Sequence, residues 1–180
     1  AYDMDFENRN DVTKKEYIGM ISLKTGVLLA GALKMGAIVA KAKAEDMNLL
    51  AEFGLNIGIA FQLKDDELDC WSNLKDFGKV TGTDIVDNKK TILYLTAIEK
   101  ANTQDKQTLL NLYLTKTIDF QKKQKTVRDI FEKNKVREDV EEMIKSYTNK
   151  ALDALDKVSV EDNKKENLRT FAKKLIDRSR

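Results

Sequence analysis

The 180-residue chain contains no proline, no histidine, only eight glycines and a single cysteine, Cys70. Average usage of about 5% would supply roughly nine prolines, and proline and glycine are the residues that mark turns and sheet edges. Their scarcity predicts long helices. One cysteine cannot form an intrachain disulfide, and a chain without histidine has no imidazole for a metal site, a catalytic triad or acid–base chemistry. Any chemistry must therefore use carboxylates, lysines, hydroxyl groups and metal ions.

A strong charge of one sign is also missing, because 32 lysines and arginines nearly balance 30 aspartates and glutamates and leave a net charge of +2. This balance argues against nucleic acid as a partner. Residues 1–11 are acidic and polar, unlike a signal peptide. The most apolar run, Gly26–Ala40, is interrupted by Lys34 and is too short to cross a bilayer of about 30 Å. We therefore predict a cytoplasmic protein without a membrane span.

The length predicts a single domain over residues 1–180, and apolar residues recur at helical spacing along most of it. Thr13 and Glu16 have the spacing of a capping box, so a long helix is expected to begin there. It should continue to about Lys43, with a bend near Thr25-Gly26. Small residues in this helix would allow close contact with a neighbouring helix: Gly26, Ala30, Gly31 and Gly36.

A second helix is predicted from about Glu45 to Trp71, and residues 72–90 are predicted to form a loop. Structureless loops longer than about 12–15 residues are uncommon in compact domains and usually have a function. The rest of the chain again has the helical period. The helices expected there cover residues 91–101, 105–116, 118–133, 136–158 and 163–178, the last after a cap at Ser159.

The composition changes most sharply at the end of the second helix. Leu55–Leu63 is apolar almost all round, which predicts deep burial, and Asp65, Asp66 and Asp69 follow directly. Asp65 and Asp69 are four residues apart and lie on one helix face, where like charges destabilise the helix unless a cation binds them. Mg²⁺ typically takes one or two carboxylates together with waters and phosphate oxygens. The alternative is an acidic turn exposed to solvent.

Lysines and glycines are spaced along the loop that follows. Gly78-Lys79 and Gly82 precede Asp84, and Lys89-Lys90 close the loop. Ammonium groups neutralise phosphate charge, and glycine lets backbone amides approach phosphate oxygens, so this composition suits a diphosphate. The alternative is that the lysines are simply solvated. Lys24-Thr25 adds a donor pair in an apolar helix, with a snorkelling lysine and an intrahelical hydroxyl bond as the alternative.

Four segments together resemble the C-terminal half of the trans-isoprenyl diphosphate synthases, the polyprenyl synthetase family of farnesyl and geranylgeranyl diphosphate synthase type. The run FQxxDDxxD, followed by GKxxGxD and by a lysine five residues later, is highly specific, and the resemblance extends from about Asp3 to the end of the chain. The segments are Lys24-Thr25, Gly58–Asp69, Gly78–Asp84 and Asp87–Thr91.

The resemblance implies an all-α, isoprenoid-synthase-type bundle of antiparallel helices around a deep apolar cavity. It implies a short-chain trans-prenyltransferase that condenses an allylic diphosphate with isopentenyl diphosphate by Mg²⁺-dependent ionisation, condensation and elimination. A homodimer is also implied. Some apolar residues would either line the cavity or pack in an ordinary core: Met20, Val27, Leu28, Met35, Leu55, Ile59 and Phe61.

Site roles are carried over from the family position by position. Asp65 becomes the principal Mg²⁺ ligand of the second aspartate-rich motif, Asp66 and Asp69 become secondary or water-mediated ligands, and Asp84 supports that metal shell. The lysines that contact the diphosphate would be Lys24, Lys79 and Lys89. Lys24, Thr25 and Gln62 would form the catalytic group, in which Thr25 and Gln62 lie beside the reacting carbons.

The chain departs from the family in one large respect, because it supplies neither the first aspartate-rich motif nor the arginines that bind isopentenyl diphosphate. We therefore expect it to be the C-terminal part of a longer synthase, inactive as 180 residues alone, with one face of Gly26–Ala40 uncovered. The alternative is a non-catalytic helical fragment or subunit that serves in folding or interaction. A terpene cyclase shares the metal chemistry but lacks the lysine-bearing GKxxGxD loop.

Overall fold

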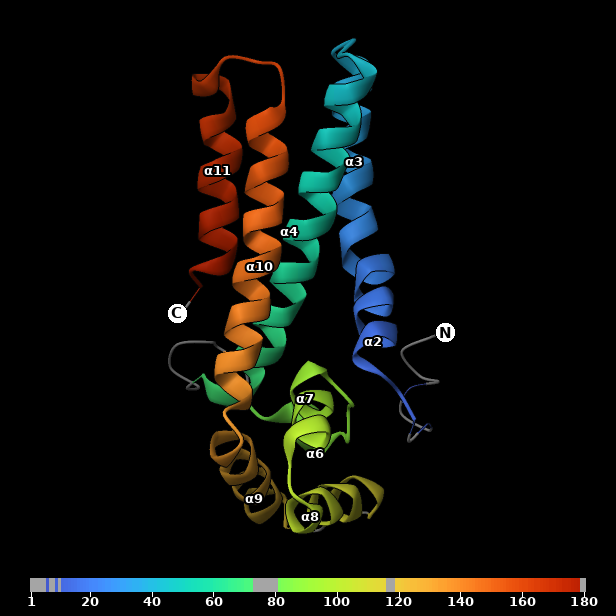
Figure 1. The fold of residues 1–180 in the computed structure, drawn as a ribbon, viewed down its shortest axis with the longest axis vertical. Helices are drawn as coiled ribbons and strands as arrows, with labels where there is room; N and C mark the ends of the chain where they lie inside the picture. The colour runs from blue at the N-terminus through green and yellow to red at the C-terminus, as the bar shows by residue number, and fades with distance from the viewer. Residues whose placement is uncertain (1–5, 7–8, 10, 73–80, 116–118, 179–180) are drawn as a thin grey trace. The chain divides into compact units, whose positions relative to one another are not determined.

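The computed structural model describes Phe6, Arg9 and residues 11–72, 81–115 and 119–178. All regular structure within these residues is helical, which confirms the predicted all-α class (Figure 1). The elements are α2 (Lys14–Ile21), the π-helical turn η1 (Ser22–Gly26), α3 (Val27–Val39), α4 (Ala44–Trp71), α6 (Thr83–Val86), α7 (Ile92–Lys100), α8 (Thr103–Leu114), α9 (Phe120–Lys133), α10 (Val136–Lys157) and α11 (Asp162–Ile176).

Local signals in the sequence placed most helix ends within two residues. The capping box is present, since the Thr13 backbone amide donates to Glu16 Oε2 at 2.9 Å and the Glu16 amide donates to Thr13 Oγ1 at 3.2 Å. Where a bend was expected, near Thr25-Gly26, the structure has the π-helical turn η1. Such turns interrupt the regular hydrogen-bond ladder and are frequent at functional sites.

Two expectations about loops need correction. Ser159 does not cap α11: the N-cap is Glu161, and the Ser159 amide and hydroxyl instead donate to Asp46 at 2.7 and 2.6 Å. The Asp46 carboxylate accepts from both Ser159 donors, whereas the N-terminus of a helix presents N–H groups and could accept from neither. The predicted 72–90 loop contains the short helix α6, while its residues 73–80, with Gly78 and Lys79, lie outside the described residues.

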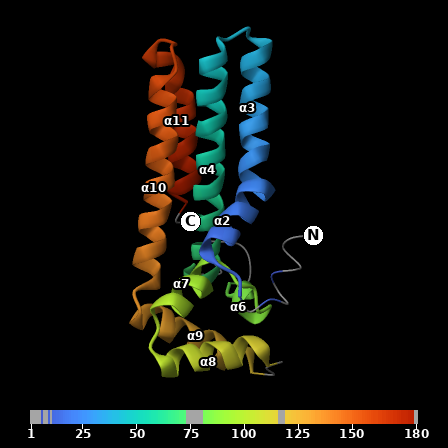
Figure 2. The same cartoon turned by 45° about the vertical axis from the view of Figure 1, so that its right-hand side comes forward.

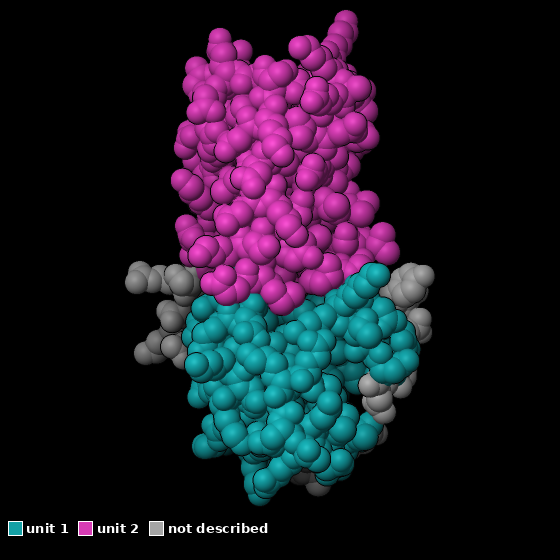
Figure 3. All heavy atoms as spheres, in the orientation of Figure 1, with its two compact units in different colours: residues 1–17, 65–141, 179–180 teal, residues 18–64, 142–178 magenta. Residues whose placement is uncertain are grey.

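The described chain divides into two compact units, coloured separately in Figure 3. Unit 1 comprises residues 1–17, 65–141 and 179–180, and unit 2 comprises residues 18–64 and 142–178. Helices α4 and α10 each contribute to both. The single domain expected for residues 1–180 stays a prediction.

Unit 2 is a helical bundle in which α3, α4, α10 and α11 run side by side, as Figures 1 and 2 both show. The apolar residues of α10 and α11 follow the helical period, and this places them against the middle of α4. The core consists of Phe53, Ile57, Ala151, Ala154, Leu155, Val158 and Ala172. Leu29 and Leu33 of α3 pack against its edge.

Glycines set the close contact between α4 and the segment η1–α3. A β-carbon added to Gly58 would lie 2.6 Å from the Gly26 α-carbon, and one added to Gly54 would lie 2.8 Å from the Ala30 nitrogen. The prediction that Gly26 and Ala30 allow close contact is therefore confirmed. A β-carbon added to Gly31 or Gly36 would have no neighbouring atom within 4 Å, so their small size is not used in this contact.

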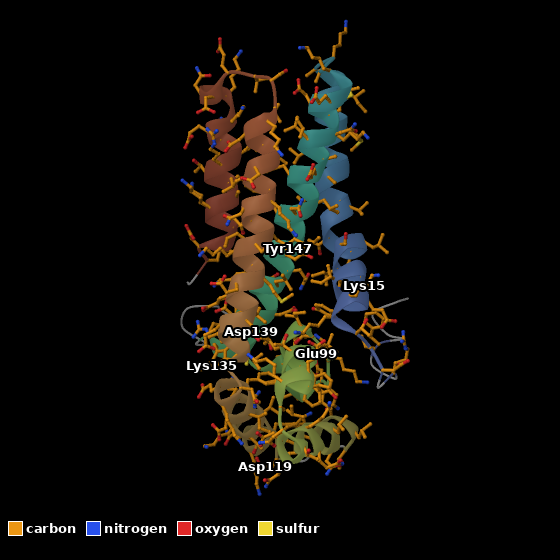
Figure 4. All side chains as sticks on the ribbon, in the orientation of Figure 1. Lys15, Glu99, Asp119, Lys135, Asp139 and Tyr147 are labelled. Carbon is orange, nitrogen blue, oxygen red and sulfur yellow. The ribbon has the colours of Figure 1, made fainter. Side chains whose placement is uncertain are left out.

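Unit 1 is built from short helices, in which α9 contacts α6, α7 and α8, and α7 also contacts α8. Its apolar residues include Leu109, Val127 and Val136, all fully buried. The rings of Tyr94 and Tyr113 lie 4.2 Å apart. Ion pairs also join elements, since Lys14 contacts Glu99 of α7 at 2.7 Å and Lys100 contacts Asp139 of α10 at 2.6 Å (Figure 4 labels Glu99 and Asp139).

One side of η1 and α3 carries large apolar side chains that this chain leaves exposed: Leu23, Val27, Leu28, Met35, Ile38 and Val39. Among the described residues, Lys14–Val39 is the one helical stretch long and apolar enough to cross a membrane, and 17% of its 18-residue window is buried. It exceeds the Gly26–Ala40 run considered from sequence because α2, η1 and α3 are continuous in the chain. Such a stretch is weak evidence for a membrane span, because a mostly buried core helix and a signal sequence near the N-terminus pass the same test.

The two classes of glycine should respond oppositely to alanine. Gly58→Ala is expected to lower the free energy of unfolding by about 1–3 kcal/mol, because its methyl group would overlap the backbone of Gly26. Gly36→Ala is expected to raise it by about 0.5–1 kcal/mol, because alanine favours the helix and the position is open. Urea unfolding followed by circular dichroism measures both. Equal effects at the two positions would contradict the close contact.

Candidate metal and diphosphate site

The last two turns of α4 carry the acidic run, and the structure gives its members different surroundings. Asp65 is partly exposed. Asp66 is only 4% exposed, and its Oδ2 accepts a hydrogen bond from the Tyr17 hydroxyl at 2.5 Å. Glu67 is 1% exposed and accepts from Arg137 Nε and Nη2 at 3.1 and 3.0 Å. Asp66 is therefore held inside unit 1, and Asp65 presents the more accessible carboxylate.

Asp69 joins the end of α4 to the start of α6. Its Oδ1 accepts from the Thr83 hydroxyl at 2.6 Å and from the Thr83 amide at 3.3 Å, and its Oδ2 accepts from the Asp84 amide at 3.0 Å. The Gly82 amide donates to the Asp69 carbonyl at 2.6 Å. The first amides of a helix have no intrahelical acceptor, so this carboxylate supplies the cap that Gly82, the N-cap residue, cannot.

Asp84, in the first turn of α6, forms an ion pair with Lys89, which follows the helix, and Lys89 Nζ lies 2.7 Å from Asp84 Oδ1. Burial raises the pKa of the Asp84 carboxyl, and this effect outweighs the opposing one of Lys89. The hydrogen bond to Asp84 raises the pKa of Lys89, so the ammonium form persists at neutral pH. Nearly half of the Lys89 side chain is exposed, so the lysine remains accessible to an anion.

The neighbouring lysine has a different role. Lys90 is buried, and its ammonium group donates to the carbonyls of Phe6, at 3.3 Å, and of Arg9. Lys90 therefore links Phe6 and Arg9 to the end of the loop. Of the three lysines proposed to contact a diphosphate, Lys89 lies in this unit beside Asp84, and Lys79 lies outside the described residues.

The remaining predicted residues lie in unit 2. Thr25, within η1, donates from Oγ1 to Gln62 Oε1 at 3.3 Å, so the structure brings these two together. Lys24 precedes Thr25 in the same π-helical turn and is exposed.

The sequence did not point to two residues of α9 that contact the loop of Asp84 and Lys89. Lys123 and Gln124 donate hydrogen bonds to backbone carbonyls of that loop, and Lys123 also donates to the Asn88 side-chain oxygen.

The chemistry of the donor set fits a metal that shares its ligands with a substrate. Within the residues that the structure describes, no group of three or more acidic or cysteine side chains is placed to hold a metal ion. A closed protein cage is therefore not formed there. Mg²⁺ does not need one, since it typically binds one or two carboxylates and completes its shell with waters and phosphate oxygens. Asp65 suits such an arrangement.

The fold and these groups define an all-helical protein with carboxylates and a lysine gathered where a long helix ends, an arrangement suited to a metal-bound phosphate ester. The family model of polyprenyl synthetase matches residues 1–132, and the chain belongs to this family. It is 35% identical over 159 residues to a geranylgeranyl diphosphate synthase of Sulfolobus acidocaldarius. That match covers 88% of this chain and 48% of the relative.

Solved structures give the same result for the fold. A geranylgeranyl pyrophosphate synthase superposes with a TM-score of 0.91 and 38% identity, over 99% of this chain and 56% of that one. A geranylgeranyl pyrophosphate synthase of Corynebacterium glutamicum, complexed with isoprenyl diphosphate and magnesium, has a TM-score of 0.88 and 25% identity, over 98% and 50% of the two chains. The expected isoprenoid-synthase fold is confirmed. The chain spans about half the length of these relatives.

Loss of the Asp69 cap should weaken the loop. Asp69→Ala is expected to lower the free energy of unfolding by about 1–2 kcal/mol, because two backbone amides and a hydroxyl lose their acceptor. Asp69→Asn keeps one acceptor oxygen and should cost less. Urea unfolding measures the change, with Asp119→Ala, which removes the side-chain cap of α9, as the matched control. A stability unchanged by Asp69→Ala would exclude the capping role.

Cys70, next to Asp69, should report on the integrity of this helix end. Burial raises the pKa of its thiol to about 12. With an ordinary cysteine pKa of about 8.5, the native thiol then carries on the order of a thousandfold less thiolate at pH 8 than the unfolded one. Alkylation by iodoacetamide should be correspondingly slow until urea unfolds the chain. Rapid alkylation of the folded chain would show that Cys70 is accessible.

Proposed function

We propose that this chain forms the second metal- and diphosphate-binding part of a short-chain trans-prenyltransferase, which condenses an allylic diphosphate with isopentenyl diphosphate. The observation that carries the proposal is the linkage of α4 to the loop through Asp69, because it brings the ion pair Asp84–Lys89 to the acidic end of α4. Family membership and the magnesium and isoprenyl diphosphate in the Corynebacterium relative support it.

The chain's own residues would act electrostatically. Breaking the allylic C–O bond leaves negative charge on the diphosphate, and positive groups already in place lower the barrier because they need no reorganisation. Lys89, with Lys24 and Lys79, would neutralise that charge. Mg²⁺, when bound through Asp65 and assisted by Asp66, Asp69 and Asp84, would supply Lewis-acid charge to the same oxygens. No proton has to be transferred in this ionisation, so a chain without histidine can support it.

Thr25 and Gln62 would serve the carbon side of the reaction. Their oxygens are already oriented by a mutual hydrogen bond of 3.3 Å. Such dipoles favour positive charge on nearby carbons, and an apolar, water-poor site protects an allylic cation from hydrolysis. The cation would then be captured by the double bond of isopentenyl diphosphate, and loss of a proton would complete the product. We also propose a homodimer, as the family resemblance implies, and a cytoplasmic location, as the composition of the chain predicts.

Mg²⁺-dependent binding of inorganic pyrophosphate to the 180-residue chain tests the binding half of the proposal. Asp65→Asn and Lys89→Met are each expected to weaken it about tenfold or more, because each removes a charge-assisted contact. Titration calorimetry at fixed ionic strength provides the affinity. Asp153→Asn, an exposed change on α10, is the control and should leave it unchanged. Equal affinities for all four proteins would contradict the assignment.

Transfer activity needs the other half of the fold. A chimera that joins this chain to the part of the Sulfolobus synthase that it does not match should convert allylic and isopentenyl diphosphates to longer products. Asp65→Ala in the chimera should lower kcat by orders of magnitude, since a charge contact in the transition state is worth about 3–4 kcal/mol by analogy with oxyanion-hole donors. Turnover by the 180-residue chain alone would refute the expected need for the other half.

The exposed apolar face favours a second candidate function, that of a non-catalytic interaction module. Six large apolar side chains between Leu23 and Val39 remain open to solvent, and exposed apolar patches commonly mark interaction sites. The two candidates differ in one measurement. A module would associate through this face and bind no pyrophosphate, whereas the synthase part binds pyrophosphate with Mg²⁺ whether or not the face is covered.

A further inference from the structure

A buried lysine of α9 contacts the loop that carries Asp84 and Lys89. The Lys123 side chain is 2% exposed, and its ammonium group donates to the Asn88 side-chain oxygen and, at 3.4 Å, to the Val86 carbonyl. The same group lies 5.2 Å from the centre of the Tyr113 ring, an additional cation–π contact. Burial lowers the pKa of Lys123, so the ammonium form depends on these partners.

The next residue of α9, Gln124, binds the part of the same loop that precedes α6. Gln124 Nε2 donates to the carbonyls of Thr81 and Gly82 at 3.2 and 3.1 Å. Gly82 suits this position because its φ of +76° is strained for other residues, and a β-carbon there would lie 2.6 Å from Gln124 Nε2. Two consecutive side chains of α9 therefore bind residues 81–82 and residues 86–88.

A buried ammonium group must give up its hydration, and the hydrogen bonds of Lys123 to the loop offset that cost. Asn88, one of its partners, has a φ of +58°, in the left-handed region that asparagine adopts more readily than most residues. The loop between the two anchored ends contains Asp84, and Lys89 follows directly. Together with the Asp69 cap, the α9 contacts hold the backbone on both sides of the ion pair Asp84–Lys89.

We propose that Lys123 and Gln124 are positioning residues, which fix the loop so that Lys89, oriented by Asp84, meets a metal-bound diphosphate. This inference rests on the proposed function and deepens it. Neither residue contacts the ligand in this assignment. Lys123 is too deeply buried, and the polar groups of both are directed to the loop by the bonds described.

The test uses the 180-residue chain and two measurements. Hydrogen exchange follows the amides of Val86, Asp87 and Lys89, which are hydrogen-bonded within the loop. Calorimetry follows inorganic pyrophosphate in MgCl₂. Lys123→Met keeps the length of the side chain but removes the ammonium donor. It should speed exchange of these amides and weaken pyrophosphate binding, each about tenfold, because a buried charge-assisted hydrogen bond is lost.

Lys125→Met is the matched control, since Lys125 lies on the same helix, is largely exposed and pairs only locally with Asp129. It should change neither measurement. Lys123→Arg, which restores the charge and donors, should recover part of the lost affinity. If Lys123→Met does not fold, as judged by circular dichroism, Gln124→Glu takes its place, because it is nearly isosteric and cannot donate to Thr81 or Gly82.

The outcomes separate the two proposals. Wild-type chain that binds no pyrophosphate overturns the proposed function. Wild-type chain that binds, combined with a Lys123→Met chain of equal affinity, overturns the positioning role and leaves the proposed function standing. Faster exchange with unchanged affinity also overturns it, since the contact would then be merely structural. Faster amide exchange together with weaker pyrophosphate binding supports the positioning role, provided that both occur in Lys123→Met or Gln124→Glu and neither occurs in Lys125→Met.

Discussion

The carboxylate of Asp69 is the contact on which the candidate site depends. It lies near the end of a 28-residue helix and accepts the first free amides and the threonine hydroxyl of a four-residue helix. A helix of four residues is too short to be stable alone, because nucleation costs more than one hydrogen bond returns. The cap and the α9 contacts therefore decide where Asp84 and Lys89 lie.

Acidic residues that look alike in the sequence have separate uses in the structure. Asp66 and Glu67 are buried with Tyr17 and Arg137, Asp69 caps α6, and Asp65 is partly exposed. This division explains how four acids tolerate each other within five residues: hydrogen bonds and a guanidinium group satisfy the buried ones. A metal bound here would take most of its ligands from waters and phosphate oxygens, as Mg²⁺ typically does.

The exposed apolar face of η1 and α3 would be stabilised by any surface that covers it, and the relatives have chain beyond the part matched here. The geranylgeranyl diphosphate synthase of Sulfolobus is about twice as long as its match to this chain. Unit 2 covers only part of the large apolar residues of this segment. Any surface that removes them from water stabilises the segment by about 25 cal/mol per Å² of apolar area buried. The glycine-lined contact of α4 with η1 and α3 occupies the other side of the same segment.

The helical class, most helix ends, the capping box at Thr13 and the family could be predicted from the sequence, because they depend on local periodicity and on residues adjacent in the chain. The sequence did not point to Lys123 or Gln124, the cap predicted at Ser159 was wrong, and Asp66 and Asp69 were given the same role. These points required the folded structure. A hydrogen bond between residues tens of positions apart has no sequence pattern, and burial, which determines whether a charge is free to bind a ligand, depends on what the folded chain packs around it.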